Sequence, residues 1–380
     1  MVQQEHGSVT YGVITESNQQ ESRVALTPEI VTRLKKSNIA CVIQQGAGEA
    51  SQFSDDQYEK AGATVVSRDE VFRRANVFGF INRPQDADLA ALPHGSWVVG
   101  MLGSFTDQQY VKKLDQAGLT ALAMERLPRQ LSSAQSMDEM TSQNSVMGYK
   151  AALLAADSYG SFFPMMTTAA GTIRPAKVLV LGAGIAGLQA IGTAKRLGAI
   201  VTGYDVRPAS RQEVESLGAR FLDLGLDFSQ GQGEGGYARQ LTQEEQAQQQ
   251  AAVDSKAAAF DVVITTAKVP GRRPPLLLTK AGVEGLHRGA VIIDCAASDL
   301  GGNVEGSKPG KTVTDNGVII FGTPDLASGV ATTASNLAAR NLADVVSHFA
   351  TAEGMKFDLS EALDDALVVS GRTEGDGGNE

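Results

Sequence analysis

The sequence is poor in several features that mark common classes of protein. It has 2 cysteines, Cys41 and Cys295, which lie far apart and show neither a disulfide framework nor metal-ligand spacing. Such sparse cysteine use suits a reducing cytoplasm. The 4 histidines, at positions 6, 94, 287 and 348, are scattered, and we interpret them as surface or structural residues. No metal site is therefore expected.

Long apolar runs and basic stripes are also missing. No run approaches the about 20 apolar residues of a membrane-spanning helix, and the polar N-terminus lacks the pattern of a signal peptide. The formal net charge is −10, which argues against nucleic acid as a partner. With 380 residues, 42% hydrophobic and 20% charged, the chain is globular and long enough for two domains. We expect a cytoplasmic protein.

The most informative stretch runs from Val178 to Gly187. The apolar run 178–181 between turn residues is typical of a buried parallel strand. Glycines at 182, 184 and 187 then give the spacing G-x-G-x-x-G. Gly182 permits a tight turn, Gly184 lets a pyrophosphate approach the backbone, and Gly187 lets the next helix pack close to the sheet. Free N–H groups at the start of that helix would bind the phosphates.

The surroundings of this turn strengthen the prediction. An amphipathic helix follows it, and a second strand at 200–204 ends at Asp205, eighteen residues past Gly187. A carboxylate there accepts hydrogen bonds from the adenosine ribose and favours NAD over NADP. Arg207, two residues on, weakens that preference. The alternative is an α/β domain in which Asp205 caps a helix and no ligand binds.

The first 125 residues form a second α/β pattern without a glycine fingerprint. Strands are predicted at 9–14, 39–44, 63–66, 77–80, 97–102 and 119–123, with helices between them. This alternation indicates a parallel sheet. The first helix should run from Pro28 to about Lys36 with Thr27 as its N-cap.

A polar segment, 127–144, separates the two patterns. It is followed by a predicted long helix from Val146 to about Met166, in which Met165 and Met166 are interpreted as core filler. A late helix at 336–349 should return to the first domain. The predicted domains are 1–144 with 325–370, and 145–324. A glycine-rich loop at 225–236 and a tail at 371–380 are expected to be flexible.

Several segments together resemble the alanine dehydrogenase/transhydrogenase family. They are Arg23–Glu29, Gln45–Gly48, Ala134–Asp138, Gly182–Ala190 with Thr193–Ala199, Asp205–Arg207, Glu215–Gly218, Gly235–Ala238 and Val291–Asp294. The chain is most similar to the NAD(H)-binding domain I, or alpha subunit, of proton-translocating transhydrogenases. The resemblance implies an α/β fold of two Rossmann-like parallel-sheet subdomains joined by long helices, with NAD in the cleft between them.

The resemblance also implies a function. Domain I passes a hydride from NADH to NADP⁺ held by domain III of a partner chain, and membrane domain II couples this transfer to proton movement. The chain should then be a homodimer and be peripheral to the inner membrane through its partners.

Site residues follow from the same resemblance. Gln135, Asp138 and Thr141 match the family's Gln, Asp and Ser near the nicotinamide, and Arg129 matches the family's Arg if one residue is inserted. These four are the predicted catalytic residues. The predicted cofactor contacts are Arg129, Gln130, Leu131, Gln135, Gly182, Gly184, Ile185, Ala186, Gly187, Asp205, Val206, Arg207, Gly236, Tyr237, Thr266 and Ala267.

Two alternatives remain open. Alanine dehydrogenase reduces pyruvate with ammonia, which requires a cation and a proton donor. The family's Lys should lie near Asn82 and its His near 101–103, but neither is present, although Arg23 and an acidic motif at 299–302 remain. Hydride transfer between two nicotinamides needs only approach and orientation. Departures at Thr15 and at 323–327 leave open an NAD-binding regulatory module that transfers nothing.

Overall fold

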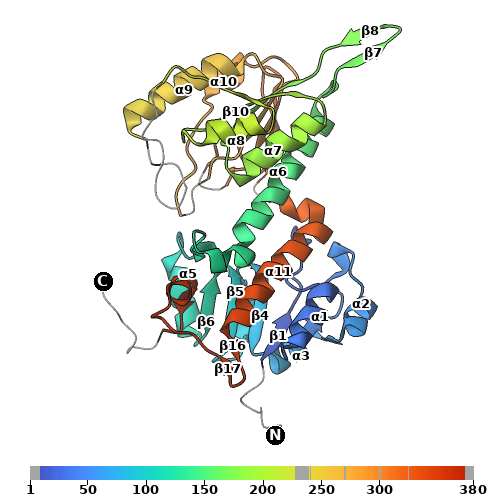
Figure 1. The fold of residues 1–380 in the computed structure, drawn as a ribbon, viewed down its shortest axis with the longest axis vertical. Helices are drawn as coiled ribbons and strands as arrows, with labels where there is room; N and C mark the ends of the chain where they lie inside the picture. Colours follow the sequence, from blue (N-terminus) through green and yellow to red (C-terminus); the bar gives the residue numbers. More distant parts are fainter. Residues whose placement is uncertain are drawn as a thin grey trace. The chain divides into compact units, whose positions relative to one another are not determined.

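The computed structural model describes residues 9–226, 239, 241–268, 271–298, 301–323 and 325–372. The loop predicted at 225–236 and the tail predicted at 371–380 lie almost wholly outside these residues. The chain divides into two compact units (Figure 1). Unit 1 comprises Met1–Gln143 and Val330–Glu380, and unit 2 comprises Asn144–Gly329. The chain thus leaves unit 1 once and returns to it once.

Unit 1 is built on a seven-stranded sheet with the order β18-β6-β5-β4-β1-β2-β3. The parallel strands are β1 (Thr10–Val13), β2 (Ala40–Gln44), β3 (Thr64–Val66), β4 (Val77–Asn82), β5 (Trp97–Met101) and β6 (Thr120–Ala123). The late strand β18 (Val368–Ser370) pairs antiparallel with β6 at the edge. No pattern in the sequence predicted β18, which is only three residues long.

Helices cover both faces of this sheet. On one face pack α1 (Pro28–Lys36) and α11 (Ala331–Phe349), and on the other α3 (Arg68–Arg74), α4 (Asp86–Ala91) and α5 (Gln108–Gln116). Alternate side chains of β4 enter the two cores: Val77 and Ile81 join the first, and Phe78 and Phe80 the second. Both faces are buried, so these strands are almost wholly apolar. Two shorter helices are α2 (Asp55–Ala61) and α12 (Ala362–Leu367).

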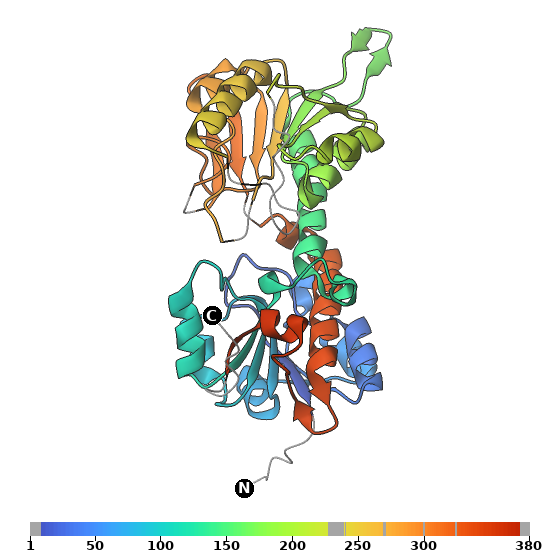
Figure 2. The ribbon, with the colours of Figure 1, turned by 60° about the vertical axis from the view of Figure 1, so that its left-hand side comes forward.

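Unit 2 has a second seven-stranded sheet, with the order β11-β10-β9-β12-β13-β15-β14. Its strands are β9 (Lys177–Leu181), β10 (Ile200–Tyr204), β11 (Arg220–Phe221), β12 (Val262–Thr265), β13 (Val291–Asp294), β14 (Gly310–Val313) and β15 (Ile319–Gly322). Only the pairing of β14 with β15 is antiparallel among these described strands. Helices α7 (Ile185–Arg196) and α8 (Ser210–Ser216) cover one face, and α9 (Gln243–Ala257) and α10 (Lys280–Gly285) the other (Figure 2).

The long helix begins and ends earlier than predicted. Helix α6 spans Glu139–Ser158, not 146–166. Its start is set by Asp138, whose Oδ1 accepts the Thr141 N–H at 2.8 Å, the position of an N-cap bond. The prediction followed apolar content and overlooked this cap. Among the described residues no helix is both long and apolar enough to cross a bilayer.

One further local prediction is wrong. Met165 and Met166 are 64% and 37% exposed, because β7 (Met166–Thr168) and β8 (Gly171–Ile173) form a hairpin that extends from the rest of unit 2 (Figure 1). The N-cap of α1 is Thr27, as predicted, although its hydroxyl makes no cap bond. It is buried and lacks a hydrogen-bond partner among the described residues, since the side chain faces the core.

Candidate functional site

The turn after β9 has the geometry that a glycine fingerprint requires. Gly182 has φ +96°, which L side chains rarely adopt, and its N–H donates to the Tyr204 carbonyl at 2.8 Å. A Cβ on Gly187 would lie 1.8 Å from the Gly182 carbonyl oxygen, so only glycine fits there. A Cβ on Gly184 would meet nothing within 4 Å. Packing within the protein therefore does not require glycine at position 184, whereas the close approach of a ligand would.

The first turn of α7 is open to an anion. Gly184 is its N-cap. Within the described part of the chain, the backbone N–H groups of Ile185, Ala186 and Gly187 have no hydrogen-bond acceptor. Unpaired donors at the positive end of a twelve-residue helix are suited to binding an anion such as a phosphate.

Asp205 lies beside this turn at the end of β10. Its Oδ2 accepts the Ala183 N–H at 2.8 Å, and its Oδ1 accepts the Arg207 N–H at 2.9 Å and Nε at 3.0 Å. The guanidinium also donates to the Ala183 carbonyl at 3.1 Å. The Arg207 charge is thus paired with Asp205. The pairing makes Arg207 a poor binding partner for the 2′-phosphate of NADP. Val206 between them is half-buried.

The strand on the other side of β9 supplies the next two predicted contacts. Thr266 Oγ1 donates to the Gly182 carbonyl at 2.9 Å, and Ala267 is held at both its N–H and its carbonyl by the Asn303 side chain, each at 2.9 Å. Asn303 was not predicted, because its partner lies 36 residues away. Gly236 and Tyr237 lie outside the described residues.

The segment before α6 brings three of the four predicted catalytic residues together. Arg129 Nε donates to Asp138 Oδ2 at 2.9 Å, and its NH2 donates to Thr141 Oγ1 at 2.6 Å. Thr141 Oγ1 in turn donates to the same Asp138 oxygen at 2.6 Å. Gln135 does not join this cluster: it lies on a 3-10 turn (Ser132–Met137) and is exposed. Gln130 and Leu131 are exposed as well.

Gly148 is a positioning residue that the sequence-based prediction missed. A Cβ on it would lie 2.0 Å from the carbonyl oxygen of Ala186, so helix α6 packs directly against the first turn of α7. An isolated glycine within a helical pattern was the available signal for such a close approach. Helix α6 thereby supports the turn that presents the N–H donors.

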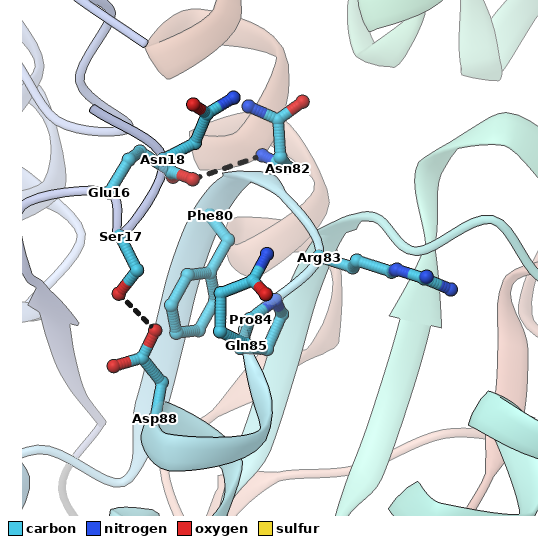
Figure 3. Close-up of a pocket in the computed structure, with 9 residues that line it drawn as sticks. All are labelled: Glu16, Ser17, Asn18, Phe80, Asn82, Arg83, Pro84, Gln85 and Asp88. Carbon is cyan, nitrogen blue, oxygen red and sulfur yellow. Dashed lines mark hydrogen bonds between the residues drawn. The ribbon is translucent and has the colours of Figure 1, made fainter. Parts of the chain in front are cut away.

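The carboxyl edge of the unit 1 sheet is filled by acids of its own chain. Glu16 accepts the backbone N–H of Ile81 at 2.7 Å and of Asn82 at 3.4 Å. Burial raises the pKa of Glu16 to about 7, and the nearby Glu21 carboxylate adds to this. Glu16 is one of the residues that line a small pocket (Figure 3). The volume of this pocket is about 10 Å³, which is room for about one water.

Glu139 is an unusual member of this region. It is 1% exposed, and neither carboxyl oxygen has a hydrogen-bond partner among the described residues. Burial raises its pKa well above the ordinary value, the Glu16, Glu125 and Glu21 carboxylates act in the same direction, and Arg23 opposes them. Burial thus favours the neutral form of this carboxyl at the start of α6.

Comparison with known proteins follows the same division of the chain. Residues 12–147 match the family model "Alanine dehydrogenase/PNT, N-terminal domain", and residues 151–373 match the corresponding C-terminal domain.

This chain belongs to the alanine dehydrogenase/PNT family.

Relatives within the family fall into two groups. The first part of NAD(P) transhydrogenase subunit alpha from Rickettsia prowazekii is 39% identical over 364 residues, 94% of this chain and 93% of that protein. The alanine dehydrogenase of Mycolicibacterium smegmatis is 29% identical over 304 residues, 78% of this chain and 75% of that protein. A solved transhydrogenase from Sinorhizobium meliloti is similar with a TM-score of 0.79 and 37% identity, covering 89% of this chain and 93% of that one. The family, the α/β fold of two Rossmann-like units and the enzyme class predicted from the sequence are confirmed.

The set of side chains expected for alanine dehydrogenase is incomplete in this chain. Asn82 stands where the dehydrogenase Lys was sought, and its Nδ2 donates to Glu21 Oε2 at 2.8 Å. Arg23 remains but is buried in an ion pair with Glu21 at 2.6 Å. Burial acts to raise the pKa of Glu21, but the pair with Arg23 outweighs it and lowers that pKa to about 2. No imidazole replaces the missing His at 101–103.

Proposed function

We propose that this chain is the NAD(H)-binding subunit of a proton-translocating transhydrogenase. It passes a hydride from NADH to NADP⁺ that a partner domain III holds, and a membrane domain couples the transfer to proton movement. One observation carries the proposal: the glycine turn of unit 2 presents three N–H groups that have no acceptor among the described residues, beside a carboxylate at the end of the next strand.

The residues present fit a bound NAD(H). The Ile185–Gly187 N–H groups would hold the pyrophosphate, Gly184 leaves space for its approach, and Asp205 would accept from the adenosine ribose. NADH supplies the hydride once it is bound. Everything else the chain contributes is binding and orientation, because hydride transfer between two nicotinamides requires no acid or base.

The Arg129–Asp138–Thr141 cluster is proposed to orient the nicotinamide end. Its hydroxyl and carboxylate are locked by mutual bonds of 2.6 to 2.9 Å, so they present a fixed polar surface. Gln135 is exposed on the turn that precedes Asp138, and its side-chain amide makes no hydrogen bond to another described residue, so it is available to the cofactor or to the partner's nucleotide. This assignment rests on the family resemblance.

The proposed function requires partner subunits. The relative from Rickettsia is named as one portion of a subunit, and we infer that this chain also assembles with membrane and NADP(H)-binding subunits. We further propose a homodimer. The exposed apolar side chains of Phe162, Met165, Met166 and Ile173, within and beside the β7–β8 hairpin, support it. Sedimentation of a monomer at micromolar concentration would refute the dimer.

Transfer is tested with purified domain III. NADH and an oxidised NADP analogue are mixed with both proteins, and reduction of the analogue is followed. We expect Gln135→Ala to slow transfer at least about tenfold while NADH affinity changes less than about twofold. Ser133→Ala, also exposed on the same turn, is the matched control and should change neither.

The outcomes separate the alternatives. NADH binding without any transfer would favour a regulatory module. Alanine-dependent reduction of NAD⁺ without a partner would make the chain a dehydrogenase. An equal loss of transfer and affinity in Gln135→Ala would show that Gln135 only binds cofactor.

A further inference from the structure

Lys268 lies three residues past the end of β12, next to the predicted phosphate turn. The backbone before it is fixed, since Thr266 bonds to the Gly182 carbonyl and Ala267 is held twice by the buried side chain of Asn303. A Cβ on Gly182 would lie 3.0 Å from the Ala267 N–H nitrogen. The backbone immediately before Lys268 is therefore packed against the glycine turn.

The order of the strands decides which half of a dinucleotide lies near Lys268. Strand β9 lies between β10, which ends at Asp205, and β12, which leads to Lys268. With the adenosine ribose at Asp205 and the pyrophosphate on the turn after β9, the other half of the molecule extends over β12. That half carries the nicotinamide.

The ammonium group of Lys268 is available to a ligand. Its side chain is exposed, and it forms no hydrogen bond or ion pair with another described residue. Partial desolvation by the surrounding protein lowers its pKa, while Cys295, Asp294 and Asp325 act in the opposite direction. The Asp294 carboxylate is already engaged, because it accepts from Thr265 Oγ1, Ala296 N–H and Val304 N–H.

We propose that Lys268 places a positive charge beside the nicotinamide ring and so makes the site prefer reduced over oxidised cofactor. The inference rests on the proposed NAD(H) binding. The ring of NAD⁺ carries a positive charge and the ring of NADH carries none, so a neighbouring ammonium repels only the oxidised form. NAD⁺ and NADH carry the same pyrophosphate. A lysine that contacted only this pyrophosphate would therefore contribute equally to the affinity for both forms.

The test is the ratio of the dissociation constants of NAD⁺ and NADH, measured by calorimetry on the full chain. Lys268→Met should lower this ratio about fivefold, mainly by tightening NAD⁺. Lys268→Arg keeps the charge and should keep the ratio. Lys177→Met removes an exposed lysine at the opposite, amino-terminal edge of the same sheet and should change nothing.

ADP-ribose, which has no nicotinamide, is the decisive control ligand. Its affinity should be the same in Lys268→Met and in the original chain, and this also shows that the variant is folded. An equal loss of affinity for NAD⁺, NADH and ADP-ribose would overturn the inference in favour of a phosphate contact, and an unchanged ratio would overturn it outright. If the original chain binds neither nucleotide, the proposed function itself fails.

Discussion

The two units share one architecture but differ at the carboxyl edge of their sheets, in whether the backbone N–H groups there have hydrogen-bond acceptors. In unit 1, Glu16 accepts the N–H groups of the last two residues of β4, Ile81 and Asn82. Glu125 accepts the N–H groups of Leu102 at 3.0 Å and Ser104 at 2.6 Å, after β5. In unit 2, the N–H groups of the first α7 turn keep no acceptor among the described residues.

This difference shows what turns a parallel sheet into a nucleotide site. An edge whose donors are satisfied by its own carboxylates has nothing to offer a phosphate and repels it by charge. An edge whose donors are left open, beside glycines that keep side chains away, attracts one. Sheet topology alone does not choose between them; a few residues at the strand ends do.

The largest effect is expected from Gly187→Ala. The new Cβ would lie 1.8 Å from a backbone oxygen, so the turn must shift. We expect a loss of about 2 kcal/mol or more in unfolding free energy and loss of NADH binding, measured by urea denaturation and nucleotide titration. Gly192→Ala, in the same helix, is the control: its Cβ would meet only the end of Arg196 at 3.6 Å. Equal stability of the two variants would contradict the packing described for the turn.

Gly184→Ala separates folding from binding. Nothing lies within 4 Å of its Cβ, so unfolding free energy should stay within about 0.5 kcal/mol. NADH affinity should nevertheless fall about tenfold or more, because the methyl group occupies the approach path of the pyrophosphate. Equilibrium dialysis gives the affinity. An unchanged value would mean that phosphates do not approach this turn.

Asp205→Asn tests the ribose contact. We expect NADH affinity to fall about fivefold to tenfold, the effect of losing charge-assisted hydrogen bonds. The preference for NADH over NADPH should narrow too, since the variant leaves Arg207 without its carboxylate partner. Binding of both nucleotides is measured at one salt concentration. Unaltered NADH affinity would remove Asp205 from the site.

Glu139→Gln tests the buried acid at the start of α6, and its effect on stability should be smallest at acidic pH. Because the pKa of Glu139 is raised on folding, its neutral form favours the folded state below its unfolded pKa. That stability is lost as pH rises through the folded pKa. The variant should therefore gain stability relative to the original chain as the pH rises above the unfolded pKa of Glu139, about 4.5. Urea denaturation at pH values below and above this pKa measures it, and a constant difference would contradict the assignment.

Local signals in the sequence indicated the candidate site in unit 2, whereas contacts between residues far apart in the sequence could not be predicted. The glycine turn and Asp205 lie within 24 residues, so spacing alone located them. Glu16 and the N–H groups it accepts are 65 and 66 residues apart, and no periodicity marks such a bond. Asp138, as an N-cap, could have predicted the start of α6. The residues that follow it are polar, and the prediction, which followed apolar content, therefore placed the start of the helix too late.

A crystal structure with NADH is the sharpest test of the proposed nucleotide site. We expect the pyrophosphate within hydrogen-bond distance of the Ile185–Gly187 N–H groups, with the adenosine ribose at Asp205. A dinucleotide bound at the carboxyl edge of unit 1, or a glycine turn left empty at saturating NADH, would contradict it.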